Sequence, residues 1–249
     1  MDTAFRDRFI DLWHKHFPDV DLPIAFYYTE DKNRGEPIPP PEGHRCMVGV
    51  IARARKGKSI LLDCKSVGCT GGERYCGFTE SMMPDFEYFL SYGIPGQMEG
   101  ERYKKSPEIV QKITAKMPTF TAPAPYILFK RWDRLDPVDS PEVVIFFAEP
   151  DVIAGLFTLA GFDEIETDSV IAPFGAGCAT IVQYPYLEQM SDTPRAVMGM
   201  FDISARPCVP KNELTFAVPM KKFESMAGNM DESFLITPSW AAVKKRIGS

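Results

Sequence analysis

The order of hydrophobic and polar positions predicts a chain in which strands and helices alternate. Apolar residues at helical spacing, with suitable capping residues, predict helices over residues 5–16, 46–55, 106–117 and 150–160 and just after 175. Short apolar runs between turn-forming residues predict strands over residues 22–29, 59–63, 126–132, 142–148, 168–172, 197–201 and 214–218. Residues 35–43, with four prolines, and residues 64–77, with three cysteines and four glycines, are predicted to be loops. The run 142–148 (EVVIFFA) is nearly continuous in apolar residues, as expected of a strand covered on both faces. We therefore expect a mixed α and β fold, α+β or α/β, in a single domain over residues 1–249.

The order strand, helix, strand and then Gly-Cys occurs twice, over about residues 22–78 and 142–187. Strands and helices of the C-terminal region, 195–249, follow the second copy. The closest correspondence is a matched interval, from Gly68-Cys69 to Tyr75 and from Gly177-Cys178 to Tyr184. This pattern predicts two similar strand-helix-strand halves related by a pseudo-twofold axis. The alternative is that such units look alike because they obey the same packing rules.

Charge and composition restrict the partners. The formal net charge of -6 argues against nucleic acid, which requires a basic surface. No apolar stretch is long enough to span a bilayer, and the first residues do not resemble a secretory signal. We therefore expect a cytoplasmic protein that does not bind a membrane, with its six cysteines as reduced thiols. A homodimer is an expectation from the general frequency of symmetric assemblies.

The segment Gly68-Cys69-Thr70-Gly71-Gly72 carries the strongest signal for a site. Its glycines allow a sharp turn after a strand and can direct several backbone N–H groups to one side. A thiol there, particularly at a helix N-terminus, would have its thiolate stabilised, and the same loop could instead bind an anion. The segment lacks the Lys-Ser/Thr of a phosphate-binding loop and the full dinucleotide-binding pattern.

The cysteines leave three interpretations open. An iron–sulfur centre or another soft-metal site would have to be assembled in space, with Cys69 and Cys178 as the first ligands, because the spacing is not that of a zinc ribbon or a ferredoxin. The same cysteines could be reactive or ligand-contacting thiols. They could also pack as small hydrophobic residues.

Four more residues complete the candidate site. His44 and Arg45 precede Cys46, where a nearby cation would lower the thiol pKa. Arg206 could bind a carboxylate or phosphate, or hold a turn through backbone carbonyls. Tyr75 and Tyr184 could line a pocket or simply pack.

These residues together resemble the uncharacterised ArCR family, domain-of-unknown-function family 169. The resemblance covers about residues 5 to 230. It is carried by Arg45-Cys46, Cys69-Thr70-Gly71-Gly72 with Tyr75, residues 141–150 (PEVVIFFAEP), Cys178 ahead of Pro185, and Arg206 ahead of Glu213. It implies a shared fold and marks Cys46, Cys69, Cys178 and Arg206 as family positions, and it implies no activity. Cys64, Cys76 and Cys208 do not match family positions.

From these observations we expect a protein that binds a small molecule, metal or cofactor at the two Gly-Cys loops, with a redox role as an extension. The expected ligand-contacting residues are Cys46, Gly68, Cys69, Gly71, Gly72, Tyr75, Gly177, Cys178, Tyr184 and Arg206. One alternative is a non-catalytic binding or scaffold protein with structural cysteines. Another is a thiol-nucleophile enzyme, and no reaction follows from the residues themselves.

Overall fold

A continuous run of apolar residues over 143–148 forms a central strand that is buried on both faces. In the computed structural model, which describes residues 1–247, every residue of strand β7 (Val143–Ala148) is buried. Val143, Ile145 and Phe147 belong to the core on one face, and Val144, Phe146 and Ala148 belong to the core on the other. The continuous apolar run in the sequence is therefore the expected sign of a strand covered on both sides.

The described residues form an eight-stranded sheet in the order β2-β3-β6-β1-β7-β10-β9-β8. Its strands are β1 (Ile24–Thr29), β2 (Glu36–Pro37), β3 (Ile60–Leu62), β6 (Tyr126–Arg131), β7 (Val143–Ala148), β8 (Val170–Ile171), β9 (Ala196–Gly199) and β10 (Leu214–Pro219). Neighbours run antiparallel except for the two outermost pairs, β2–β3 and β8–β9, which are parallel. At the centre, β1 and β7 pair with Ala25 opposite Val144.

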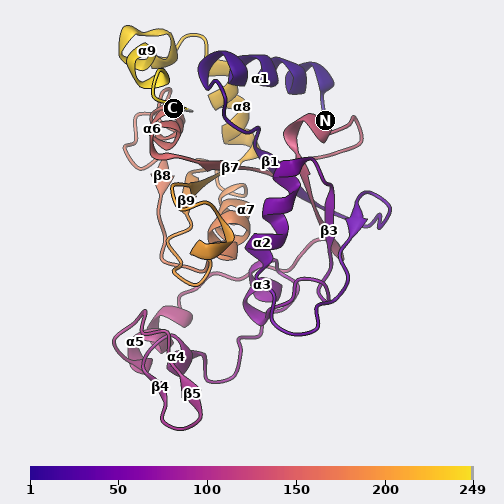
Figure 1. Ribbon diagram of the computed structural model, residues 1–249, viewed down its shortest axis with the longest axis vertical. Helices are drawn as coiled ribbons and strands as arrows, with labels where there is room; N and C mark the ends of the chain where they lie inside the picture. Colours follow the sequence, from indigo (N-terminus) through magenta and orange to yellow (C-terminus); the bar gives the residue numbers. More distant parts are fainter. Residues whose placement is uncertain (248–249) are drawn as a thin grey trace.

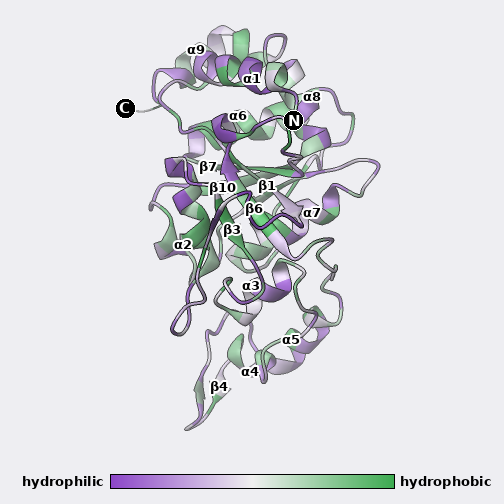
Figure 2. Cartoon of the chain, turned by 90° about the vertical axis from the view of Figure 1, so that its right-hand side faces the viewer, coloured by the Kyte–Doolittle hydropathy of each residue, from purple (hydrophilic) through white to green (hydrophobic). Residues whose placement is uncertain are grey.

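Helices cover both faces of this sheet (Figure 1). One face carries α1 (Thr3–His16), α6 (Pro150–Ala160), α8 (Met220–Asn229), η5 (Phe234–Ile236) and α9 (Pro238–Lys244). The other carries α2 (Met47–Ile51), η1 (Ala52–Lys56), α3 (Thr70–Tyr75), the π-helix η3 (Ala179–Gln183) and α7 (Tyr184–Glu188). In Figure 2 the strands between these layers are predominantly apolar. Within residues 1–247, no helix has the length and apolar character needed to cross a bilayer.

A small lobe extends away from the layered body on the side of α3 (Figures 1 and 2). It contains α4 (Phe86–Phe89), β4 (Gly93–Ile94), β5 (Met98–Glu99) and α5 (Pro107–Thr114). Its returning segment touches the body at two points. The Tyr103 hydroxyl accepts a hydrogen bond from Ser204 N (3.0 Å), and Lys104 Nζ lies 3.6 Å from the centre of the Phe174 ring.

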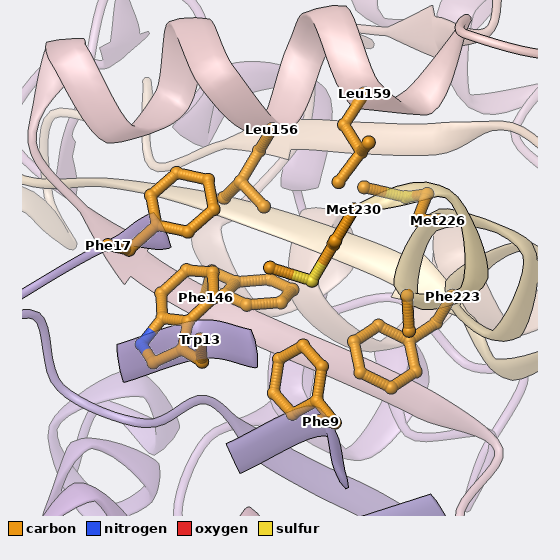
Figure 3. Close-up of a pocket in the computed structure, with 10 residues that line it drawn as sticks. Phe9, Trp13, Phe17, Phe146, Leu156, Leu159, Phe223, Met226 and Met230 are labelled. Carbon is orange, nitrogen blue, oxygen red and sulfur yellow. The ribbon is translucent and has the colours of Figure 1, made fainter. Parts of the chain in front are cut away.

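Two hollows lie away from the cysteines. Figure 3 shows an apolar void between α1, α6, α8 and the sheet, lined by residues that include Trp13, Phe146 and Met230. Its volume of about 10 Å³ is at the lower limit for a single water molecule, so it is a packing defect of a dry core. A second hollow, of about 350 Å³, lies on the lobe, between Met82, Phe86 and Gln111.

Most expected elements are present, with several differences. The helix expected over residues 46–55 is divided into α2 and the 3-10 helix η1, and the helix expected just after 175 is the π-helix η3. The segment from Cys64 to Gly77 is expected to be a loop, but it contains α3, whose first residues include Gly71 and Gly72. The proline-rich segment 35–43 contributes the short edge strand β2.

Candidate functional site

The N-termini of α2 and α3 are held side by side by Arg45 and Gly68. Arg45 N donates to the Gly68 carbonyl (3.0 Å), and Arg45 Nη2 donates to the Ser66 carbonyl (2.6 Å). Gly68 has φ +89°, and a Cβ there would lie 3.0 Å from Pro41 Cγ and 3.2 Å from the Arg45 carbonyl oxygen. The position therefore requires glycine. As a result Cys46 and Cys69, the N-cap residues of α2 and α3, are neighbours.

The Cys69 sulfur receives backbone donors from both helices. It accepts a hydrogen bond from Gly72 N at 3.3 Å, as a side-chain cap of α3, and another from the backbone of Met47 in α2. A Cβ on Gly72 would lie 2.5 Å from Val67 Cγ1 and 3.1 Å from the Cys69 sulfur. Gly72 is thus needed for the sulfur to approach the helix end this closely.

A second sulfur meets α2 from the other half of the chain. Cys208 ends the short helix η4 (Arg206–Cys208), and its sulfur accepts a hydrogen bond from the backbone of Gly49. The Cys208 thiol also forms a side-chain hydrogen bond with Cys46. Cys46 does not cap α2 with its own side chain, so its sulfur remains available to this neighbour.

The second Gly-Cys pair, Gly177-Cys178, packs closely against α2 and the loop after β9. Gly177 N donates to Asp202 Oδ2 (2.9 Å), and a Cβ on Gly177 would lie 3.0 Å from Ala205 Cβ and 3.1 Å from Val48 Cγ2. This close approach places Cys178 at the start of the π-helix η3, beside α2 and α3. A π-helix is an uncommon element that frequently marks functional positions.

Burial raises the pKa of the Cys69, Cys178 and Cys208 thiols, that of Cys208 to about 11. The thiols also affect one another: Cys69 contributes to the raised pKa of Cys178, and Cys46 contributes to those of Cys69 and Cys208. The backbone donors at Cys69 and Cys208 act in the opposite direction without outweighing burial. A ligand that binds thiolates here must therefore displace protons.

Other sulfur atoms lie close to these thiols. The buried Cys76 thiol donates to Met47 Sδ at 3.2 Å. Met200, buried and with φ +67°, has its Sδ 3.2 Å from the place of a Cβ on Gly177. We call Cys46, Cys69, Cys76, Cys178, Cys208, Met47 and Met200 the sulfur cluster.

The predicted tyrosines border the cluster. Tyr75 is buried and Tyr184 half-buried, and burial raises the pKa of both hydroxyls. Cys178 and Tyr184 contribute to the raised pKa of Tyr75. A Cβ on Gly71 would lie 3.5 Å from the Tyr75 ring. At the far end of η3, the Gln183 side chain is fully buried; its Nε2 donates to the Pro118 carbonyl (2.9 Å) and its Oε1 has no partner.

Arg206 lies on the loop next to the cluster, but its guanidinium is engaged elsewhere. It donates to the backbone carbonyls of Pro210 (3.3 Å), Lys211 (2.8 Å) and Glu213. The sequence leaves two roles open for Arg206, namely binding a carboxylate or phosphate and holding a turn through backbone carbonyls. The observed contacts are those of the second role. Cys64 is exposed and is not part of the cluster.

Several members of the site were not selected from the sequence: Cys76, Cys208, Met47, Met200 and Asp202. Cys76 and Cys208 match no family position, and no role was assigned to the other three. Asp202 Oδ1 accepts from Ser204 N (3.1 Å) while Oδ2 accepts from Gly177, so one carboxylate orders both loops. The pattern Asp202-x3-Arg206-x-Cys208 after a strand was the available signal.

The metal prediction finds limited geometric support. Within residues 1–247, no group of three or more His, Cys, Asp or Glu side chains is arranged to hold a metal ion. An iron–sulfur cluster is ordinarily held by four cysteine thiolates, so that part of the expectation lacks a ligand set here. The pair Cys69 and Cys178 as metal ligands stays a prediction.

The fold and the sulfur cluster define a mixed α/β protein with thiols gathered on one face of its sheet. The model of the uncharacterised ArCR family, a domain of unknown function, matches residues 21–229, so the chain belongs to this family. The match includes all the strands and the whole sulfur cluster. No curated protein and no solved structure matches the chain.

Proposed function

We propose that the protein binds a small thiophilic ligand, a soft metal ion in the first place, through the sulfur atoms of Cys69 and Cys178. The observation that carries the proposal is the convergence of these two thiols from distant loops at the ends of α3 and η3. Thioether and thiol sulfur are the ligands that soft cations such as copper(I) prefer. Met47 and Met200 add thioethers close to the pair.

The shape of the site favours a ligand of atomic size over a large cofactor. The surroundings of the two sulfurs are close-packed. A Cβ on Gly72 would lie 2.5 Å from Val67 Cγ1, and a Cβ on Gly177 would lie 3.0 Å from Ala205 Cβ. A single ion needs no preformed cavity, whereas a cofactor does.

The direction of the thiol pKa values argues against a cysteine nucleophile in the ligand-free protein. A nucleophilic cysteine ordinarily has a lowered pKa. Burial raises the pKa of Cys69, Cys178 and Cys208 instead. A soft ion overcomes this barrier by binding the thiolate directly, with release of the proton.

Copper(I) titration under anaerobic conditions, against a chromophoric copper(I) chelator, tests the proposal. We expect one equivalent to bind more tightly at higher pH, and binding to be lost in Cys69→Ser and in Cys178→Ser. Cys64→Ser is the matched control, because Cys64 is an exposed cysteine outside the cluster. Equal binding by all variants, or none by the wild-type chain, contradicts metal binding.

Native mass spectrometry of anaerobically purified chain separates the two kinds of thiophilic ligand. A co-purifying metal identifies an ion. A co-purifying organic mass that disappears in Cys69→Ser identifies a small molecule. If the two serine variants change only the free energy of unfolding, the cysteines are structural, as in a scaffold protein.

The twofold organisation is a further part of the proposal and is supported by strand order. Outward from the centre, the strands run β1-β6-β3-β2 on one side and β7-β10-β9-β8 on the other, with the same relative directions at each step. In this correspondence α2 matches η3, so Cys46 matches Cys178, and the loops after β3 and β9 carry Cys69 and Cys208. The sequence intervals instead paired Cys69 with Cys178.

In this correspondence, the cysteine pairs Cys46–Cys208 and Cys178–Cys69 each join the helix start of one half to a loop of the other half. Superposition of the four strands of one half on those of the other tests the duplication: one rotation of about half a turn must align β1 with β7, β6 with β10, β3 with β9 and β2 with β8. Alignment of only the central pair would contradict duplication.

A further inference from the structure

The Cys46 and Cys208 side chains form a contact that the proposed metal site does not use. Cys46 is the N-cap residue of α2, and a Cβ on Gly49, one turn further along, would lie 3.6 Å from the Cys208 sulfur. The Cys208 sulfur therefore lies against the first turn of α2, and its side chain interacts with that of Cys46. The two thiols are neighbours although the residues are far apart in sequence.

Both partners are partly accessible. Cys46 and Cys208 are half-buried, as is Cys69, whereas Cys76 and Cys178 are buried. A dissolved oxidant can therefore reach this pair. Cys64, the exposed cysteine, is outside the cluster.

The backbone holds the Cys208 sulfur in place against α2. Gly49, the third residue of that helix, donates its N–H to this sulfur, and a Cβ there would lie 3.6 Å from it. The loop that carries Cys208 is itself fixed by Asp202, through Gly177 and Ser204. The two thiols are thus presented to each other by ordered segments.

We propose that Cys46 and Cys208 form a redox-active dithiol that closes reversibly to a disulfide by exchange with low-molecular-weight disulfides. This activity goes beyond the proposed metal binding and does not depend on it. The disulfide would link the start of α2 to the loop after β9.

The exchange balances in two steps. One thiol of the pair loses its proton to solvent, and its thiolate attacks one sulfur of the small disulfide, which releases one small thiolate and leaves a mixed disulfide on the protein. The other thiol then loses its proton, and its thiolate attacks the protein sulfur of the mixed disulfide, which releases the second small thiolate. Two protein thiols are oxidised by two electrons, and the small disulfide is reduced to two thiols that take up the two protons.

Each single serine variant removes the thiol that would resolve a mixed disulfide. Cys208→Ser and Cys46→Ser should therefore each accumulate a mixed disulfide on the remaining cysteine of the pair, and neither should form the cross-link.

The test uses the full chain equilibrated anaerobically with mixtures of oxidised and reduced glutathione, with the remaining thiols then alkylated. Peptide mapping without reductant should show a Cys46–Cys208 cross-linked peptide that disappears on reduction. Cys64→Ser, the matched control, should form the same cross-link to the same extent.

Two results would overturn the proposal. One is glutathione adducts on Cys46 and Cys208 in the wild-type chain with no cross-link between them. The other is modification of Cys64 with no change at the pair. A wild-type chain that forms the cross-link but does not bind copper(I) supports the dithiol and contradicts the metal site, so the two proposals can fail separately.

Discussion

Gly177 N donates a hydrogen bond to Asp202 Oδ2 at 2.9 Å, and this contact ties the loop before Cys178 to the loop that follows β9. The same carboxylate contributes to the raised pKa of Cys178 and of Cys208. One residue therefore orders the loops and also suppresses thiolate formation in both.

Asp202→Asn is expected to lower the pKa of Cys208 from its value of about 11, because asparagine keeps an acceptor for Gly177 and removes the negative charge. The shift should be small, since burial and Cys46 contribute more. The pH dependence of Cys208 alkylation, read by peptide mass, measures it. Ser204→Ala is the control, because it removes a hydrogen bond to Asp202 (2.8 Å) and leaves the charge. Unchanged profiles in both variants would contradict the electrostatic role.

Gly177→Ala should destabilise the chain by about 1–3 kcal/mol, the usual cost of overpacking. The added Cβ would meet Ala205 Cβ, Val48 Cγ2 and Met200 Sδ at 3.0–3.2 Å. Gly228→Ala, within α8, is the matched control: a Cβ there meets nothing within 4 Å, so alanine should stabilise by roughly 0.5–1 kcal/mol. Denaturant unfolding compares them. Equal changes in the two variants would show that Gly177 is not a close-approach position.

Asp139→Asn should cost about 3 kcal/mol or more, because it leaves the buried Lys130 and the partly buried Arg34 without their main counter-ion. Asp139 is fully buried and contacts Lys130 Nζ (2.9 Å) and Arg34 Nη2 (2.6 Å). Asp136 touches the same two cations with a side chain that is 45% exposed. Asp136→Asn should therefore cost clearly less in the same unfolding experiment. A reversed order would mean that Asp136 is the main partner.

Glu142 predicts a pH dependence of stability. Burial raises the pKa of its carboxyl, although Tyr28 N donates to it at 2.9 Å. A group with a raised folded pKa binds its proton more tightly in the folded state. The contribution of the Glu142 carboxyl to the free energy of unfolding is therefore fully present below its pKa in the unfolded chain. That contribution is lost as the pH rises through its pKa in the folded protein.

The isosteric variant Glu142→Gln should become progressively more stable relative to the wild-type chain as the pH rises through the mildly acidic range. Unfolding free energies measured at several pH values give the difference. Glu224→Gln, at an exposed position of α8, accounts for the general effect of losing one carboxylate. A constant difference between Glu142→Gln and the wild-type chain would show that the carboxyl does not titrate differently on folding.

Local patterns predicted the fold well where packing and pattern agree. The apolar run 142–148 predicted a strand buried on both faces, and β7 is that strand. The prediction of a loop over residues 64–77 was wrong, because Gly71 and Gly72 lower helix propensity and so argue against a helix there. The Cys69 cap and the close packing on Val67 nevertheless hold α3.

The site was predicted in part. The sequence selected Cys46, Cys69 and Cys178, which do lie together in the sulfur cluster. It could not select Cys208, because the contact with Cys46 depends on how the loop after β9 folds back onto α2. Arg206 was predicted to contact a ligand through its guanidinium, but the guanidinium donates hydrogen bonds to nearby backbone carbonyls such as that of Lys211.

The two outermost strands, β2 and β8, are only two residues long, and β2 ends in Pro37. A short strand exposes few unpaired backbone groups, and proline offers no N–H for a further strand. The sheet is therefore protected at both margins against edge-to-edge aggregation. For the same reason, extension of the sheet by a strand from another molecule is a poor route to association for this chain.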